Sequence, residues 1–333
     1  MKHYNFGSIE QFRNICKQIK MEAEYQGKDA DGNAIYNPNA PKPVLTFTGT
    51  VKLHGTNAAV VYSKEHGLYA QSRERILSIE SDNAGFAFYV ESNREYFEKA
   101  YGKALEDQGL DTLIVYGEWA GGNIQKNVGI CNTEKQFYPF LCKHIYRDTE
   151  CSFIPYWKAT PESKEYPITV FQTFTLGIDF NHPELVQNEL MRITEEVERE
   201  CPVAKAFGHS GIGEGVVWTA DWNGKQYHFK VKGEKHSSSK VKTLASVDTD
   251  KIESCQKFAE YAVTESRFEQ ALQAVFPDGN LDVKQIGALL KWMNTDIIKE
   301  EMDTLTANGL EFKEVAKHIA DATKKMFFER IKL

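Results

Sequence analysis

The sequence contains a lysine, Lys52, whose neighbours suit a nucleophile. It ends a stretch of alternating apolar residues and precedes a turn at Gly55 and an apolar stretch at 58–62, which would hold its amine at a sheet edge. Only a neutral amine attacks phosphorus, and lysine titrates near pH ~10.4 in water, so nearby cations or a metal must lower its pKa. Because the Lys-x-x-Gly pattern recurs, for example at Lys64, an ordinary surface lysine is the alternative.

Two further lysines lie on one face of a predicted strand at 227–232. Side chains alternate along a strand, so His228, Lys230 and Lys232 share one face and the apolar residues between them share the other. Two ammonium groups ~7 Å apart suit a polyphosphate. The alternative is an exposed edge strand that lysines protect from unwanted pairing.

Two glutamates add acidic groups to this set. Glu118 follows the buried strand predicted at 113–116, and an acid there needs a partner, which could be a ribose hydroxyl, a metal or a salt bridge. Glu214 lies between two glycines and is the predicted metal ligand, because Mg²⁺ takes oxygen ligands and usually only one or two carboxylates. The glycine-rich stretch at 208–213 lacks a Walker lysine, which favours a flexible loop over a phosphate cradle.

The elements that would position these residues are a mixture of helices and strands. A capping box beginning at Ser8 predicts a helix from there to about Tyr25, and turn-forming residues at 29–43 predict a loop. Hydrophobic spacing predicts further helices at 83–105 and 183–201. The segments typical of strands are 44–48, 58–62, 68–71, 113–116, 168–171, 215–218 and 227–232.

The character of the chain changes after Lys232. Residues 233–240 are small, polar and charged, as in a linker, and nearly everything from about 248 onward has helical periodicity. We therefore predict two domains, 1–242 and 243–333. The cations of the tail could hold a nucleic-acid duplex or form a solvated face of a packing domain. They are Lys313, Lys317, Lys324, Lys325, Arg330 and Lys332.

The composition narrows the class of protein. A chain of 333 residues with 41% hydrophobic and 26% charged residues is an ordinary globular protein of about two domains. Its net charge of −7 argues against coating nucleic acid by bulk charge, so a binder must keep its cations in patches, as at 225–242. The six cysteines lack metal-binding spacing. Without an apolar run of ~18 residues or a signal layout, we expect a soluble cytoplasmic protein with no membrane partner.

Four motifs resemble, in order, motifs I, III, IV and V of the covalent nucleotidyltransferases, which are ATP-dependent ligases and capping enzymes. They are KLHGTN at 52–57, YGEWAG at 116–121, GEGVV at 213–217 and FKVK at 229–232. The run GNIQKNV at 122–128 resembles the RNA ligase 2 family in particular. The resemblance implies an α+β fold: an ATP-grasp-like nucleotidyltransferase domain of antiparallel sheets flanked by helices, then an all-α C-terminal domain like that of the phage members.

The same resemblance implies an ATP-dependent RNA ligase that seals 3′-hydroxyl/5′-phosphate nicks in duplex RNA. Lys52 would carry AMP from ATP, with Mg²⁺ or Mn²⁺, and pass it to the 5′ end. The expected partner is a nicked duplex with RNA on the 3′-hydroxyl side, and the protein would be a monomer used in RNA repair. The resemblance to the phage members implies a phage-like protein that acts in the cytoplasm of a host. The alternatives are a ligase or capping-type transferase with another acceptor, such as DNA, and a non-catalytic nucleotide- or RNA-binding module.

The resemblance also assigns roles to single residues. The implied catalytic residues are Lys52, His54, Arg73, Glu118, Glu214, Lys230 and Lys232. His54 and Arg73 would serve phosphate contacts and end joining, Glu118 the ribose, and Glu214 the metal. The residues implied to bind the nucleotide are Lys52, Asn57, Arg73, Glu118, Phe140, Lys230 and Lys232. Phe140 would stack on adenine, although Phe171 competes for this role.

Overall fold

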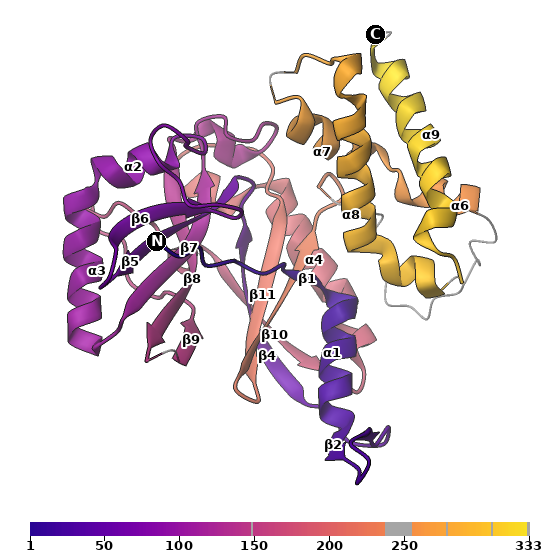
Figure 1. The fold of residues 1–333 in the computed structure, drawn as a ribbon, viewed down its shortest axis with the longest axis horizontal. Coiled ribbons are helices and arrows are strands. Elements are labelled where there is room, and N and C mark those ends of the chain that lie inside the picture. Colours follow the sequence, from indigo (N-terminus) through magenta and orange to yellow (C-terminus); the bar gives the residue numbers. More distant parts are fainter. Residues whose placement is uncertain (148, 237–254, 278, 308, 332–333) are drawn as a thin grey trace. The chain divides into compact units, whose positions relative to one another are not determined.

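The structure is a computed structural model that describes residues 1–147, 149–236, 255–277, 279–307 and 309–331. The chain divides into two compact units, Met1–Gly233 and Glu234–Leu333 (Figure 1). The domain boundary predicted near residue 243 lies outside the described residues. Within the described ranges, no helix is long and apolar enough to cross a membrane.

Two five-stranded sheets form the centre of the first unit. The first sheet has the order β1-β12-β11-β4-β10 and the second the order β6-β5-β7-β8-β9. The pairs are antiparallel except that between β1 and β12, which is parallel. The strands of the first sheet are β1 (Glu10–Gln11), β4 (Val44–Lys52), β10 (Thr173–Asp179), β11 (Gly215–Trp222) and β12 (Lys225–Lys232). Those of the second are β5 (Thr56–Ser63), β6 (Gly67–Ser72), β7 (Thr112–Ala120), β8 (Gln136–Tyr146) and β9 (Thr149–Phe153).

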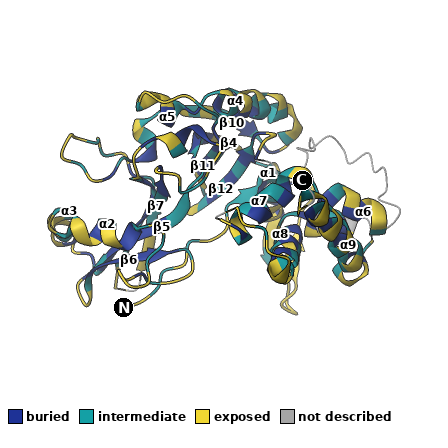
Figure 2. Cartoon of the chain, turned by 90° about the horizontal axis from the view of Figure 1, so that it is seen from above, coloured by how far each residue is buried: buried dark blue, intermediate teal, exposed yellow. Residues whose placement is uncertain are grey.

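Helices cover one face of each sheet. On the second sheet, α2 (Phe86–Ser92) and α3 (Arg94–Gln108) bury an apolar core against β5–β8, whereas α1 (Phe12–Glu24) and α4 (Gln187–Arg199) pack on the first sheet. Exposed residues gather on the outer sides of the helices and on loops, and the central strands are largely buried (Figure 2). The remaining elements are β2 (Tyr25–Lys28), β3 (Ala34–Tyr36), α5 (Pro202–Ala206) and the 3₁₀ turns η1 (Gly129–Asn132), η2 (Ile168–Val170) and η3 (Pro183–Val186).

The alternation predicted for 227–232 is confirmed. Tyr227, Phe229 and Val231 are buried in the core of the first sheet, whereas the side chains between them are only half-buried. On the neighbouring strands, Val51 and Val216 face the same core. One face of the first sheet is therefore apolar and covered, which leaves its polar residues on the opposite face.

Several sequence predictions were wrong in detail. The first helix begins at Phe12 and not at Ser8, because Glu10 and Gln11 are extended and pair with β12. The predicted loop at 29–43 contains β3, which pairs with β2. The strand predicted at 168–171 is the 3₁₀ turn η2, which follows Pro167. The helix predicted at 83–105 breaks at Asn93 between α2 and α3.

The second unit is helical in all its described residues that have regular structure, as predicted. Its elements are α6 (Cys255–Ala262), α7 (Glu265–Val275), η4 (Val283–Gln285), α8 (Ile286–Ala307) and α9 (Phe312–Ile331). Large side chains such as Phe258, Phe268 and Phe327 fill its core. The predicted α+β class with a helical C-terminal region is thus confirmed.

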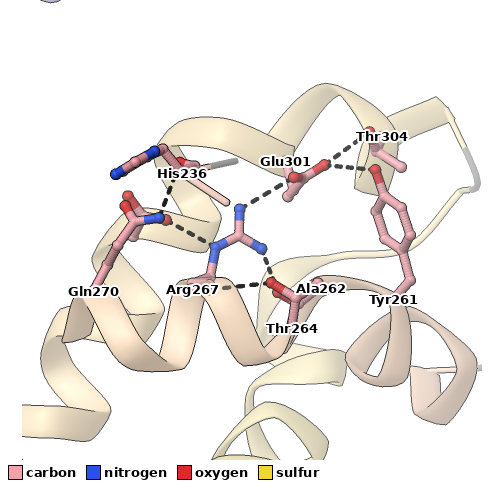
Figure 3. A network of polar contacts seen from close by, with 9 residues as sticks. His236, Tyr261, Ala262, Thr264, Arg267, Gln270, Glu301 and Thr304 are labelled. Carbon is pink, nitrogen blue, oxygen red and sulfur yellow. Dashed lines mark hydrogen bonds and ion pairs between the residues drawn. The ribbon is translucent and has the colours of Figure 1, made fainter. Parts of the chain in front are cut away.

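A buried arginine network joins the helices of the second unit (Figure 3). Arg267 on α7 is fully buried and lies 3.1 Å from Glu301 and 2.8 Å from Asp296, both on α8. Its guanidinium also donates to the carbonyl of Ala262 at the end of α6. The Tyr261 hydroxyl donates to Glu301 across 3.0 Å. Arg267 and Glu301 are shielded from water, and buried charges are stable only when they are paired with groups of opposite charge or hydrogen-bonded.

Arg267→Met should therefore destabilise the second unit by about 3–5 kcal/mol, because it removes the fully buried cation that pairs with Glu301 and Asp296. The matched control is Arg330→Met, which removes partly exposed ion pairs with Glu265 and Glu269 and should cost about 1 kcal/mol or less. Amide hydrogen exchange of α6–α9 in the full chain measures both. Equal protection in the two variants would contradict a stabilising role for the buried pair.

Candidate active site

The register of three neighbouring strands brings the predicted site residues together. Gly215 on β11 pairs with Lys52 on β4 on one side and with Lys232 on β12 on the other. Residues directly opposite each other in an antiparallel sheet have side chains on the same face. Lys52 and Lys232 therefore flank the start of β11, where Glu214 immediately precedes Gly215.

Glu214 contacts three cationic or ionisable groups at this point. Its carboxylate lies 2.7 Å from the Lys52 Nζ, 3.1 Å from the Lys232 Nζ and 3.3 Å from the His54 Nδ1. The Glu214 side chain is 2% exposed, whereas the side chains of Lys52, His54 and Lys232 are 20–23% exposed. A buried carboxylate thus gathers three groups that solvent can still reach.

This arrangement keeps Glu214 ionised. Burial by itself raises the pKa of the carboxyl, but Lys52 and Lys232, with the His54 hydrogen bond, outweigh it and hold the pKa well below its usual range. The backbone is held as well, since the N–H of Gly233 donates to the Glu214 carbonyl across 3.0 Å. The anion is therefore fixed in both charge and position.

Glycines on both sides of Glu214 and at Gly55 allow this close packing. Gly215 has φ +152°, and a Cβ there would lie 2.1 Å from the Val231 carbonyl oxygen. A Cβ at Gly213 would lie 2.5 Å from the Val197 carbonyl, and one at Gly55 would lie 2.4 Å from the Trp119 carbonyl. The glycines of the motifs are thus required by backbone approach.

Lys230 lies on the same face as Lys52 and Lys232. It pairs with Val217, which pairs on its other side with Thr50, so the polar row continues along β12 away from Glu214. Its side chain is half-buried, like that of Lys232. The predicted placement of both lysines on one face of the sheet is confirmed.

The second sheet supplies another acid. Glu118 lies within β7 and not after a strand, as the sequence suggested, and pairs with Asn57 on β5. Its carboxylate accepts from the Gly55 N–H across 3.0 Å, next to the turn that carries His54. Desolvation by the surrounding protein raises the pKa of Glu118 to about 7, with Lys52 opposing and Glu214 adding to the rise. Glu118 and Glu214 are thus coupled across the turn at 53–55.

Phe140 on the second sheet and Arg73, which comes just after β6, both contact the N-terminal segment. Arg73 follows the end of β6, and its Nη2 lies 3.5 Å from the Gly7 carbonyl. Phe140 lies on β8, with its ring 5.1 Å from that of Phe6. Its competitor Phe171 packs on Tyr138 and Phe207 instead, and lines a cavity of about 440 Å³ beside α4 and α5. No sequence motif marked Phe6 or Gly7.

A divalent metal ion fits this site only if the protein and a bound substrate both supply its ligands. Among the described residues, no group of three or more histidine, cysteine or acidic side chains could hold a metal by itself. Mg²⁺ commonly binds one or two carboxylates together with substrate phosphates, and the ionised Glu214 offers one such carboxylate. The donor set is compatible with that mode of binding.

Comparison with known families decides where the chain belongs. A family model for RNA ligases matches residues 45–232, which is more than half of the 333 residues and includes Lys52, Glu118, Glu214 and Lys232. The chain belongs to the RNA ligase family. The matched span begins within β4 and ends with β12, so it covers both sheets except for β1.

This RNA ligase family member is also similar to solved structures of an RNA ligase from Naegleria gruberi. The structure with PPi is 17% identical, with a TM-score of 0.42, and the match covers 69% of this chain and 56% of that chain. Mutants of that enzyme solved with AMP and Mn and with ATP and Mn give TM-scores of 0.41 and 0.42, each at 17% identity. These matches cover 68% of this chain and 55% of theirs. No curated protein matches. The match with this chain covers little more than half of the length of the Naegleria enzyme.

Proposed function

We propose that this protein is an ATP-dependent RNA ligase that works through a lysine–AMP intermediate on Lys52. The observation that carries the proposal is the cluster of Lys52, Glu214 and Lys232, in which Lys52 ends β4, Lys232 ends β12 and Glu214 immediately precedes the β11 strand between them. An ordinary surface lysine would not share a buried, ionised carboxylate with a second lysine.

In the first step the Lys52 ammonium leaves its ion pair with Glu214 and loses a proton to solvent, and the neutral amine then attacks the α-phosphorus of ATP and releases a second proton as the phosphoramidate forms. A P–N bond forms, the bond to the bridging oxygen breaks, and pyrophosphate departs. Lys230 and Lys232 lie on the same face of the sheet as Lys52. Their positive charges stabilise the negative charge that develops on the α-phosphate oxygens in the transition state. Glu118 and Asn57, paired on the second sheet, face the sugar, and Phe140 stacks on the base.

The next two steps transfer AMP and seal the strand. A 5′-phosphate oxygen attacks the phosphorus of the adduct, the P–N bond breaks, and Lys52 takes up a proton. The 3′-hydroxyl then attacks the activated 5′-phosphorus, AMP leaves, and the hydroxyl proton is lost to solvent. His54 and Arg73 contact the phosphates during these steps. The proposed substrate is a nicked duplex with RNA on the 3′-hydroxyl side, read through its shape and 2′-hydroxyls.

A divalent metal would be held by Glu214 together with phosphate oxygens of the substrate. When bound, it would neutralise charge on the phosphates. We propose that the predicted domains 1–242 and 243–333 divide the work, with the first carrying the chemistry. In the second, the cations of α9 would contribute phosphate contacts to the duplex.

Incubation with ATP labelled at the α-phosphate, in Mg²⁺ or Mn²⁺, tests the proposal. We expect a label that stays on the protein through denaturation and is released by pyrophosphate. If no such label forms with Mg²⁺ and none forms with Mn²⁺, the lysine–AMP mechanism is wrong. A non-catalytic nucleotide-binding module would bind ATP without forming the adduct, so equilibrium binding measured in parallel separates that alternative.

The acceptor is tested on matched nicked duplexes that differ only in the sugar on the 3′-hydroxyl side. Sealing with RNA at that side and at least ~10-fold slower sealing with DNA would support an RNA ligase, because a site that hydrogen-bonds the 2′-hydroxyl rejects a substrate lacking it. Equal sealing of an all-DNA nick would favour the DNA ligase alternative.

A further inference from the structure

The first residues of the chain are bound tightly to the second sheet. The Gln71 side chain, which is 1% exposed, accepts from the Tyr4 N–H across 3.1 Å and donates to the Tyr4 carbonyl across 2.6 Å. The Tyr116 hydroxyl donates to the same carbonyl across 3.2 Å. A buried amide that satisfies both backbone groups of one residue fixes that residue in place.

Further contacts extend this attachment on both sides of Tyr4. The Tyr69 hydroxyl donates to the Lys2 carbonyl across 2.8 Å, and the ring of His3 lies 3.1 Å from the Ser72 carbonyl. The Phe6 ring packs against Phe140 at 5.1 Å and Tyr116 at 5.3 Å, distances typical of aromatic pairs. The segment therefore touches both Phe140 and the end of β6, which Arg73 follows.

The same segment is attached to the first sheet at its other end. Glu10 and Gln11 form β1, which pairs in parallel with Phe229 and Lys230 of β12. Figure 1 shows the N-terminal trace leaving β5–β7 and crossing to β1 before α1 begins. Between its two ends it lines a cavity of about 460 Å³ whose other walls come from both sheets, including Leu141 and His228. The segment is a tether between the sheets.

We propose that residues 4–11 are a positioning element of the nucleotide site, with Phe6 and Gln71 as the residues that fix it; this role rests on the function proposed above. The predicted base and sugar contacts, Phe140 and Glu118, lie on the second sheet, whereas the phosphate-binding lysines lie on the first. One nucleotide must reach both sheets. A tether that holds these binding groups at a fixed separation keeps them matched to one nucleotide, so loosening it should lower the affinity for ATP.

Phe6→Ala and Gln71→Leu test this role in the labelling reaction. We expect the KM for ATP to rise roughly 10-fold in each, with the rate at saturating ATP and the thermal midpoint changed much less, because the tether positions groups and does not react. Phe6→Tyr keeps the ring and should restore the KM. The matched control is Phe88→Ala, a 60% exposed phenylalanine on α2 that should leave the KM unchanged.

The possible outcomes separate this inference from the proposed function. If the wild-type protein is labelled and both variants keep its KM, the tether has no positioning role and the ligase proposal stands. A loss of labelling that only follows a loss of folded protein would also overturn the inference. If the wild-type protein forms no adduct, the proposed function fails, and the role assigned to the tether fails with it.

Discussion

Replacing Lys52 by alanine should abolish the covalent AMP label, with a fall of roughly 10³-fold or more. The amine is the only group in the proposed mechanism that bonds to the α-phosphorus, so no neighbouring side chain can replace it. Gel detection of labelled protein after denaturation measures the loss. Binding of ATP should be much less affected, since Lys230, Lys232 and the second sheet remain.

Lys64→Ala is the matched control for this experiment. Lys64 also begins a Lys-x-x-Gly pattern and even has a histidine before the glycine, but it lies in the turn between β5 and β6. Its side chain is 56% exposed and pairs with Asp111 across 3.3 Å. We expect wild-type labelling from this variant. A label that persists in Lys52→Ala would contradict the assignment of Lys52 as the nucleophile. A label lost only in Lys64→Ala would identify Lys64 as the nucleophile instead.

Glu214→Gln should lower the rate of label formation by about 10²-fold or more while keeping the shape of the side chain. Glu214 is the buried anion between Lys52 and Lys232, and its removal leaves two ammonium groups to repel each other beside the site. It also removes the carboxylate proposed to share a metal with the substrate. The remaining activity should require a higher concentration of Mg²⁺ or Mn²⁺, which a metal titration of the labelling rate measures.

Glu200→Gln is a suitable control because Glu200 forms an exposed ion pair with Lys205 at 2.5 Å. Such a pair contributes little, so its labelling rate and metal dependence should match those of the wild type. Unfolding curves of both variants show whether a change reflects folding. Normal labelling by a folded Glu214→Gln protein would remove Glu214 from the mechanism.

The structure agrees with the predictions where neighbours in the chain alone decide the local conformation. The faces of β12 were predicted correctly because alternation depends only on a strand's own residues and on which side is apolar. The helices of the second unit were predicted for the same reason, since their periodicity is local. The roles given to single site residues stay predictions until the variants are measured.

The errors arose where distant segments decide the local structure. Ser8–Gln11 matches a capping box, but pairing with β12 holds Glu10 and Gln11 extended and delays the helix. The apolar run at 168–171 is typical of a strand, yet the chain turns there after Pro167. Strands β8 and β9 were not predicted, because much of their sequence is aromatic and charged without clear alternation.

By itself, the sequence determined the motifs, their order, and which residues of each strand face the core, because these follow from neighbours in the chain. Only the tertiary structure decided that Lys52 and Glu214, 162 residues apart, lie 2.7 Å from each other. That distance depends on the register of β4, β11 and β12 and on glycines that let backbones approach. The tether at residues 4–11 is likewise a tertiary feature, because its anchors come from strands far along the chain.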